Sequence, residues 1–313
     1  MIKKIFYLLK PLIPRSFQIF LRRKLVATQR VKYKNIWPIL EMAGEKPLNW
    51  PGWPDNKKFA VVLTHDVELI GGHNKCLQLA LLEKELGFVS SFNFVPERYN
   101  VSQELRDELT RLGFEIGVHG LNHDGKLFSS KKIFDERAKR INTYLKQWGA
   151  EGFRAPAMHH NLEWIHNLDV IYDLSTFDTD PFEPQSDGVN TIFPFIVKSK
   201  DFPKSYVELP YTLVQDFTLF ILMRQSDIKI WERKIDWIAE KGGMVLVNVH
   251  PDYVNFDNKY MAEEFPVDLY KNLLNYLKEN YDGKFWHSLP KEMAKYVHYQ
   301  YYGNKESTKK MNV

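Results

Sequence analysis

Two acidic residues stand one position apart at the end of an apolar segment. The segment VVLTHDVE, residues 61–68, passes from aliphatic side chains to Asp66 and Glu68. Side chains two positions apart on an extended chain lie on the same face, so both carboxylates could address one metal ion or one water molecule. The alternative interpretation is a polar strand end in which Asp66 caps the next turn.

A pair of histidines follows a second apolar segment. In GVHGLNHD, residues 117–124, His119 and His123 are four positions apart. On a turn that leads from a strand into a helix, this spacing lets two imidazoles converge on one divalent ion. With one or two carboxylates they predict an open, hydrolytic site for zinc or a similar ion.

Two further segments contribute one chemical group each. Arg154 in GFRAPA, residues 152–157, could hold a nearby carboxylate ionised, although a surface arginine is the alternative. His250 ends the apolar segment VLVNVHP, residues 245–251. A histidine in such a place is often structural, but a hydrolytic site needs a general acid and the other segments offer none.

The elements that must position these groups alternate along the chain. Apolar, β-branched runs predict strands near residues 59–63, 89–95, 114–118, 152–154, 171–177, 206–209, 244–249 and 284–287. Helical patterns lie between them, near residues 74–87, 102–112, 131–148, 228–241 and 263–280. This alternation predicts an α/β fold with a parallel sheet or barrel, whose active sites form at the C-terminal ends of strands.

Composition is that of a globular protein. The 313 residues, 44% hydrophobic and 26% charged, are enough for one large α/β domain or two modest ones. Cys76 is the only cysteine, so no intramolecular disulfide can form, and its apolar neighbours predict that it is buried. Aromatic residues make up 14% of the chain, which favours either a bulky core or stacking platforms for sugar rings.

The positive charge is concentrated in an N-terminal arm. Residues 1–39 contain ten Lys or Arg and no acid, whereas the remainder contains 33 basic and 39 acidic residues. The apolar stretch at residues 5–9 is too short for the core of a signal sequence or for a bilayer span. No basic, aromatic-interleaved surface continues into the domain, so we expect no nucleic-acid partner.

Part of this arm has the spacing of an amphipathic helix. One face would carry Phe17, Phe20, Leu21 and Leu25, and another Arg15, Gln18 and Arg22. Such a helix suits the surface of an anionic membrane, so residues 1–39 are expected to make peripheral membrane contact. Packing against the main domain is the alternative.

The chain therefore divides into four parts. We expect a basic amphipathic arm at 1–46, a Pro/Trp-rich linker at 47–56, a metal-dependent domain at 57–300 and a polar, frayed tail at 301–313.

The four chemical segments, in this order and each at a strand end, resemble the motifs of the polysaccharide deacetylase family. This family is also called the NodB-homology or carbohydrate esterase family 4 domain. The resemblance covers roughly residues 57–290. It implies a distorted (β/α) barrel of the polysaccharide deacetylase type.

The resemblance also implies roles at the metal. Asp66 would be the general base. The metal ligands would be Glu68, His119 and His123, around zinc or else cobalt, nickel or manganese.

Other roles follow from the later motifs. The resemblance implies that Arg154 orients the base, that Pro156 fixes the turn after it, and that the backbone N–H of Ala157 donates to the oxyanion. His250 would be the general acid.

The sequence departs from the family's pattern at several positions. Glu68 stands where aspartate is usual, Gly120 where Ser or Thr is usual, and His65 where an aromatic residue is usual. For the acidic residue that tunes the acid histidine in the family, Asp178 and Asp180 are the nearest candidates.

The resulting functional prediction is removal of an N-acetyl group from an amino sugar in a polysaccharide or lipid-linked glycan. One alternative is a catalytically weak, glycan-binding member of the same fold, which the glutamate at Glu68 favours. Another is hydrolysis of a different C–N bond, by a deformylase or on a cyclic amide. The basic arm without an export signal predicts a cytoplasmic protein, peripheral at the inner face of the membrane.

Overall fold

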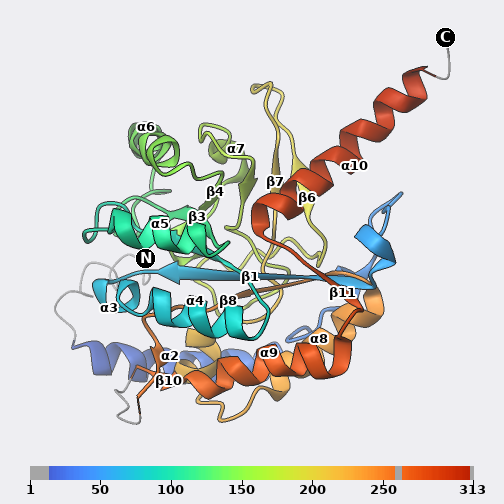
Figure 1. The fold of residues 1–313 in the computed structure, drawn as a ribbon. Coiled ribbons are helices and arrows are strands. Elements are labelled where there is room, and N and C mark those ends of the chain that lie inside the picture. Colours follow the sequence, from blue (N-terminus) through green and yellow to red (C-terminus); the bar gives the residue numbers. More distant parts are fainter. Residues whose placement is uncertain (1–13, 258–262, 311–313) are drawn as a thin grey trace.

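A curled, mainly parallel sheet forms the centre of the molecule (Figure 1). In the computed structural model, residues 14–257 and 263–310 are described. Within them the main sheet has nine strands in the order β11-β1-β2-β3-β4-β5-β7-β6, and β8 also pairs with β1. The strands are β1 (Phe59–Val67), β2 (Ser91–Phe94), β3 (Glu115–His119), β4 (Gly152–Arg154), β5 (Tyr172–Asp173), β6 (Phe195–Val197), β7 (Tyr206–Glu208), β8 (Met244–Asn248) and β11 (Phe285–His287). A separate small sheet pairs β9 (Val254–Asn255) with β10 (Phe265–Pro266).

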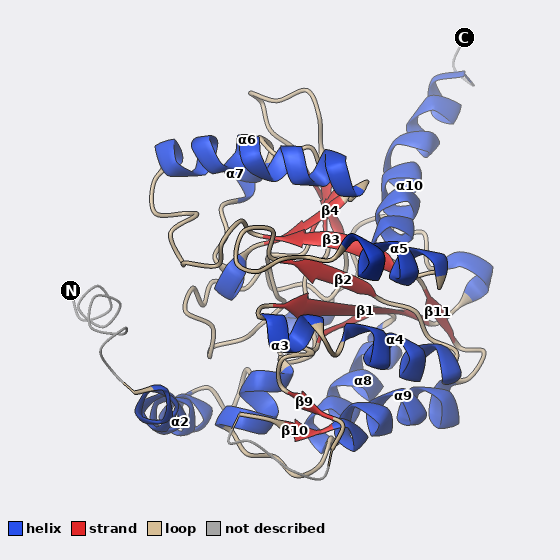
Figure 2. Cartoon of the chain, turned by 60° about the vertical axis from the view of Figure 1, so that its left-hand side comes forward, coloured by secondary structure: helices blue, strands red, loops and turns tan. Residues whose placement is uncertain are grey.

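Helices cover the outside of this sheet, with α6 and α7 on one side and α8 and α9 on the opposite side (Figures 1 and 2). The helices are α2 (Arg15–Lys32), α3 (Ile70–His73), α4 (Cys76–Glu85), α5 (Gln103–Arg111), α6 (Lys131–Trp148), α7 (Leu162–Ile165), α8 (Lys229–Lys241), α9 (Val267–Tyr281) and α10 (Pro290–Lys310). Short 3₁₀ turns are η2 (Glu41–Gly44), η3 (Pro54–Asn56) and η4 (Pro156–Met158), and η5 (Phe217–Leu222) is a π-helical segment. The distorted (β/α) barrel predicted from the sequence is confirmed.

Strand β1 is the centre of the sheet. All nine of its residues are buried, as expected for a parallel strand covered on both faces. Its first residues pair with β11, residues 60–64 pair with β8, and residues 64–67 pair with β2, all in parallel. The strand that carries Asp66 is therefore held by three other strands.

Most predicted elements are present, and the clearest case is α6. Its bounds are those predicted, because both ends carry capping signals: the Ser130 side chain accepts the N–H of Ile133, and Gly149 takes the left-handed conformation with φ 62°.

The sequence prediction missed α10. The polar end of this helix has no apolar periodicity, whereas its beginning buries Met293, Ala294 and Val297. Residues 301–310, predicted as part of a frayed tail, continue this helix, and residues 311–313 lie outside the described part of the chain.

Residues 47–56 pack on the barrel. The Trp50 ring lies 4.8 Å from that of Trp53 and 5.1 Å from that of Phe193. The indole N–H of Trp53 donates to the carbonyl of Gly242 at 2.9 Å. The segment expected as a linker thus belongs to an aromatic cluster at one end of the barrel.

Helix α2 packs beside η5 through Ile19 and Val26, which are buried. Among the described residues, no helix combines the length and hydrophobicity needed to cross a membrane.

Candidate metal-dependent active site

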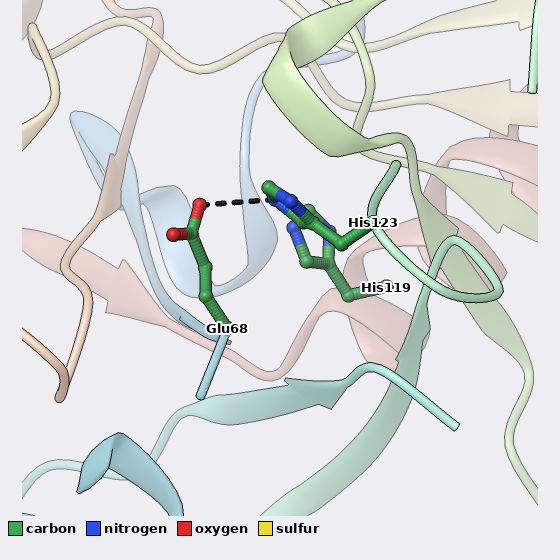
Figure 3. A group of neighbouring side chains, drawn as sticks. All are labelled: Glu68, His119 and His123. Atoms are coloured by element: carbon green, nitrogen blue, oxygen red, sulfur yellow. Dashed lines mark ion pairs between the residues drawn. The ribbon is translucent and has the colours of Figure 1, made fainter. Parts of the chain in front are cut away.

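Three predicted metal ligands meet at the C-terminal edge of the sheet (Figure 3). Glu68 follows β1, His119 ends β3, and His123 lies in the turn after it. One donor atom from each lies within 4.8 Å of the others. Glu68 Oε1 is 3.0 Å from His123 Nε2. Two imidazoles and a carboxylate in this arrangement can hold a metal ion.

The state of His119 fits a metal ligand. Its Nδ1 faces the carbonyl oxygen of Arg154 at 3.1 Å; because a carbonyl only accepts, Nδ1 carries the hydrogen and Nε2 keeps its lone pair. Burial lowers the pKa of His119 to about 4, which keeps the ring neutral. The Nε2 atom of His119 is buried and has no hydrogen-bond partner in the described structure, and that of His123 faces only the Glu68 carboxylate. An orphaned nitrogen beside an imidazole–carboxylate pair is what a bound cation would satisfy.

Glu68 is held by residues that the sequence prediction missed. The carboxylate of Asp252 accepts the backbone N–H groups of Glu68 at 2.8 Å, Leu69 at 3.0 Å and Gly72 at 3.1 Å. The Tyr253 hydroxyl donates to Glu68 Oε2 at 3.1 Å. Asp252 thereby fixes the turn between β1 and α3. It acts on backbone groups far away in sequence, so no local sequence pattern predicts this role.

Asp66 is a buried carboxylate with partners on both oxygens. Asn93 donates to its Oδ1 at 3.0 Å and Asn248 to its Oδ2 at 2.9 Å, and Arg154 Nη1 lies 3.4 Å from Oδ1. Burial alone would raise the pKa of Asp66, but the charge of Arg154, with help from His119, outweighs it and lowers the pKa to about 2. The group is therefore an ionised carboxylate near neutral pH.

Arg154 is itself fully buried and fixed in orientation. Its Nη1 donates to Thr64 Oγ1 at 2.8 Å and its Nε to the carbonyl of Leu174 at 3.0 Å. The structure thus places Arg154 beside Asp66, where the sequence prediction put it.

His250 pairs with Asp216. Its Nδ1 donates to Asp216 Oδ1 at 2.6 Å, and its backbone N–H donates to Asp216 Oδ2 at 2.8 Å. Burial would lower the pKa of His250, but the Asp216 carboxylate outweighs burial and raises it to about 10. The imidazole is therefore protonated near neutral pH. Its Nε2 lies 3.5 Å from the amide nitrogen of Asn248, which also contacts Asp66.

The candidates Asp178 and Asp180 for the acid beside His250 were wrong. Asp178 is paired with Lys234, and Asp180 accepts the hydroxyl of Tyr211 at 2.8 Å. Asp216 directly precedes the apolar run FTLFIL, and its side chain accepts the N–H of the next residue. This is a helix-capping position, and an acid before an apolar run is the sequence signal that could have identified it.

The turn after Arg154 closes one side of the site. Pro156 begins η4, and Ala157 is exposed with φ 54°. A Cβ added to Gly120 would lie 2.5 Å from Pro156 Cγ, and Gly120 has φ +63°. The close approach and the left-handed backbone explain why a glycine stands at this position.

The histidines of this turn differ in position. His159 lines a small pocket together with His123 and Phe128. His160 is held in the loop, since its Nδ1 contacts the carbonyl of Met158 at 2.9 Å.

His65 is also fully buried, away from the metal ligands. Its Nε2 lies 2.7 Å from Glu83 Oε1 and its Nδ1 lies 2.8 Å from the carbonyl of Val249. The position that the family gives to an aromatic residue is occupied here by a hydrogen-bonded imidazole.

No protein-family model and no curated protein matches this sequence. Solved structures do match. A protein described as a polysaccharide deacetylase from Mycobacterium smegmatis is 18% identical with a TM-score of 0.60, over 82% of this chain and 95% of that one. A Puue allantoinase is 14% identical with a TM-score of 0.61, over 80% and 94% of the two chains. A protein described as a polysaccharide deacetylase from Pseudomonas aeruginosa PAO1 is 14% identical with a TM-score of 0.59, over 80% and 95%.

At such low identity these likenesses establish the fold and not the activity. This chain has the fold of the polysaccharide deacetylases, and its Glu68, His119 and His123 form a cluster able to hold a metal ion.

Proposed function

We propose that this protein is a metal-dependent hydrolase that removes an N-acetyl group from an amino sugar of a polysaccharide or lipid-linked glycan. The observation that carries the proposal is the joint presence of three groups in one site. These are the possible metal ligands, the buried ionised carboxylate of Asp66, and the protonated His250. A base, an acid and a Lewis-acid position are what amide hydrolysis requires.

In the proposed reaction, water adds to the acyl carbon and the C–N bond breaks. Asp66, kept ionised by Arg154, takes a proton from the attacking water. His250 gives its proton to the departing amine nitrogen, so that acetate and a free amino sugar leave. A divalent ion held by Glu68, His119 and His123 would supply polarisation of the acyl oxygen. The backbone N–H of Ala157 is the proposed second donor to that oxygen.

The metal is proposed to be zinc. Two imidazole nitrogens and one carboxylate oxygen suit zinc and also accept cobalt, nickel or manganese. Metal analysis after loading with each ion in turn would decide among them.

Three variants test the assigned roles. Asp66→Asn should keep bound metal and lower acetate release from chito-oligosaccharide by about 10²–10⁴-fold. His119→Ala should lose both metal and activity, and His166→Ala, a histidine outside the site, should lose neither. Bound metal is measured by elemental analysis and acetate by an enzymatic assay. An Asp66→Asn variant that turns over at the parent rate would show that Asp66 is not the base.

A second candidate is hydrolysis of a cyclic amide, favoured by the similarity to an allantoinase over 80% of this chain. Incubation with allantoin, beside chito-oligosaccharide, separates the two activities. A protein that binds zinc but opens neither substrate would favour a glycan-binding role.

A further inference from the structure

Helix α2 is attached to the barrel by one face. Ile19 and Val26 of this face are buried, Arg23 Nε donates to the carbonyl of Ile221 at 2.9 Å, and Gln29 Nε2 donates to the carbonyl of Pro181 at 2.7 Å. These contacts fix the rotation of the helix about its axis, and therefore determine which residues face outward.

The outward face is apolar. Residues at intervals of three, four or seven positions share a face of a helix. The side chains on this face are exposed by 50% at Phe17, 48% at Phe20, 38% at Leu21, 58% at Leu25 and 73% at Val31. Packing on the barrel therefore does not use the apolar stripe, and a patch of this kind on a protein surface marks an interaction site.

The outward apolar patch includes a cation. Lys24 lies on the same face, with its Nζ 5.0 Å from the centre of the Phe20 ring. Residues 14–39 contain no acidic side chain. The surroundings of the patch therefore complement a negatively charged partner.

A groove beside the helix is also lined by apolar and cationic side chains. It lies between α2 and η5 with a volume of about 440 Å³ and is lined by Arg23, Arg30 and Lys34 around apolar Val26 and Leu222. Burial lowers the pKa of Arg23, and the neighbouring charge of Arg224 lowers it further. An apolar floor with a cationic rim fits a molecule that has an anionic head and a hydrocarbon part.

We infer that α2 docks this protein on a bilayer of anionic phospholipid. The residues of the outward apolar patch enter the boundary between headgroups and acyl chains, and the surrounding Lys and Arg contact the phosphates. The apolar stripe and the cationic side chains lie on one helix that has no acidic residue of its own, although Arg15 pairs with Glu263, and this matches a lipid surface in both hydrophobicity and charge. The inference goes beyond the proposed hydrolysis and does not depend on turnover.

Flotation of the full-length protein with vesicles tests this inference. The parent protein should float with vesicles of phosphatidylcholine and phosphatidylglycerol, and much less with phosphatidylcholine alone. The triple substitution Phe17→Ser, Leu21→Ser and Leu25→Ser should lower the bound fraction by about tenfold or more. Arg30→Gln with Lys34→Gln should weaken binding by about fivefold for each charge at low salt, and the loss should shrink at high salt.

Matched controls use apolar residues that are exposed elsewhere. Leu81 on α4 is 50% exposed and Leu48 is 93% exposed; Leu81→Ser and Leu48→Ser should bind vesicles as the parent does. Asp66→Asn should also bind as the parent does, so the docking and the hydrolysis can fail separately. Circular dichroism confirms that each variant is folded.

Several outcomes would overturn the inference. They are a parent protein that does not float with anionic vesicles, a triple variant that floats like the parent, and binding that ignores lipid charge. A dimer in gel filtration that the triple substitution dissociates, without any vesicle binding, would assign the patch to a second copy of the chain instead.

Discussion

His119 and His250 are both buried in the site, yet their neighbours give them opposite charge states. The Nδ1 atom of His119 meets a backbone carbonyl, so burial decides and the pKa falls to about 4. The Nδ1 atom of His250 meets the carboxylate of Asp216, which outweighs burial and raises the pKa to about 10. One ring can therefore offer a lone pair while the other offers a proton, as metal binding and acid catalysis require.

The pair between His250 and Asp216 makes a prediction for the pH dependence of activity. His250 can donate a proton only below its pKa, and Asp216→Asn removes the charge that raises this pKa. The alkaline limb of the kcat/KM profile should therefore move to lower pH by about one unit or more. The exposed Asp227, replaced by Asn, provides the control and should leave the limb in place. A limb that does not move in Asp216→Asn would mean that His250 is not the acid.

The residues of the site differ in whether a sequence pattern identifies them. Asp66, Glu68, His119 and His250 were found because each stands where an apolar run ends, and the fold brings those ends together. Asp216 was missed because it lies outside any predicted strand and reaches His250 across 34 positions.

Asp252 was missed for a related reason. It contacts backbone N–H groups about 180 positions earlier, with Glu68 at a separation of 184. Hydrogen bonds to a turn have no periodicity, so only the folded chain reveals them.

At the scale of the elements, Glu115 joins three of them. It opens β3, accepts the hydroxyl of Tyr172 in β5 at 2.8 Å, and accepts the backbone N–H of Lys291 at the start of α10 at 3.1 Å. Burial raises its pKa to about 7 in spite of these hydrogen bonds. The carboxyl group is thus easier to accommodate in the fold when it is protonated.

Buried Glu115, with its hydrogen bonds to β5 and α10, predicts that the stability of the fold depends on pH. The folded pKa of Glu115 is about 7, above the ordinary value of 4.5. Its contribution to stability is therefore fully present below pH 4.5 and is lost as the pH rises to about 7, on the order of 3 kcal/mol in all. Glu115→Gln does not titrate, so its free energy of unfolding should fall less than that of the parent across this range.

Urea denaturation at a series of pH values measures the difference. The exposed Glu279, replaced by Gln, should show the same pH slope as the parent. An identical slope in Glu115→Gln would contradict the prediction.

Among the helices and strands, those with capping signals and a regular apolar spacing could be predicted from the sequence. Helix α6 has caps and an apolar stripe, so its bounds could be read from the chain. The helical turns of η5 are wholly buried and apolar except for Thr218, and a segment without a polar face has no period to detect. Strand β6 was also missed; it is an edge strand that pairs antiparallel with β7, outside the alternation of parallel strands and helices on which the prediction rested.

At the scale of the whole molecule, a bound ion would connect the ends of two strands that flank β2. Its ligands come from the end of β1 and from the end of β3 with its turn. A ligand that binds only the folded state stabilises it, by about 2.7 kcal/mol at a concentration of 100 Kd. Zinc should therefore raise the Tm of the parent, relative to protein with chelator, on the order of 5 °C.

The matched variants make this measurement specific. His123→Ala should lose the rise in Tm with zinc, and His166→Ala should keep it. A parent protein whose Tm ignores zinc and the other divalent ions would contradict a metal site at Glu68, His119 and His123.

A chain of side-chain contacts connects helix α2 with the site. Arg15 at the start of α2 pairs with Glu263 at 2.8 Å, and its guanidinium lies 5.8 Å from the centre of the Phe217 ring. Phe217 packs on Tyr253, with ring centres 4.7 Å apart, and Tyr253 donates to Glu68. These contacts connect the helix proposed to dock on lipid with the residues around Glu68.

The position of β1 in the sheet has a consequence for folding during synthesis. All nine residues of this strand are buried, yet β8 and β11, two of its three partners, lie about 185 and 225 positions later. During synthesis on the ribosome, β2 can pair with residues 64–67 early, but the edge of β1 that pairs with β8 stays open until residues 244–248 have been translated. The strand that carries Asp66 thus has an open edge, at which a nascent chain can pair wrongly, until β8 has been made.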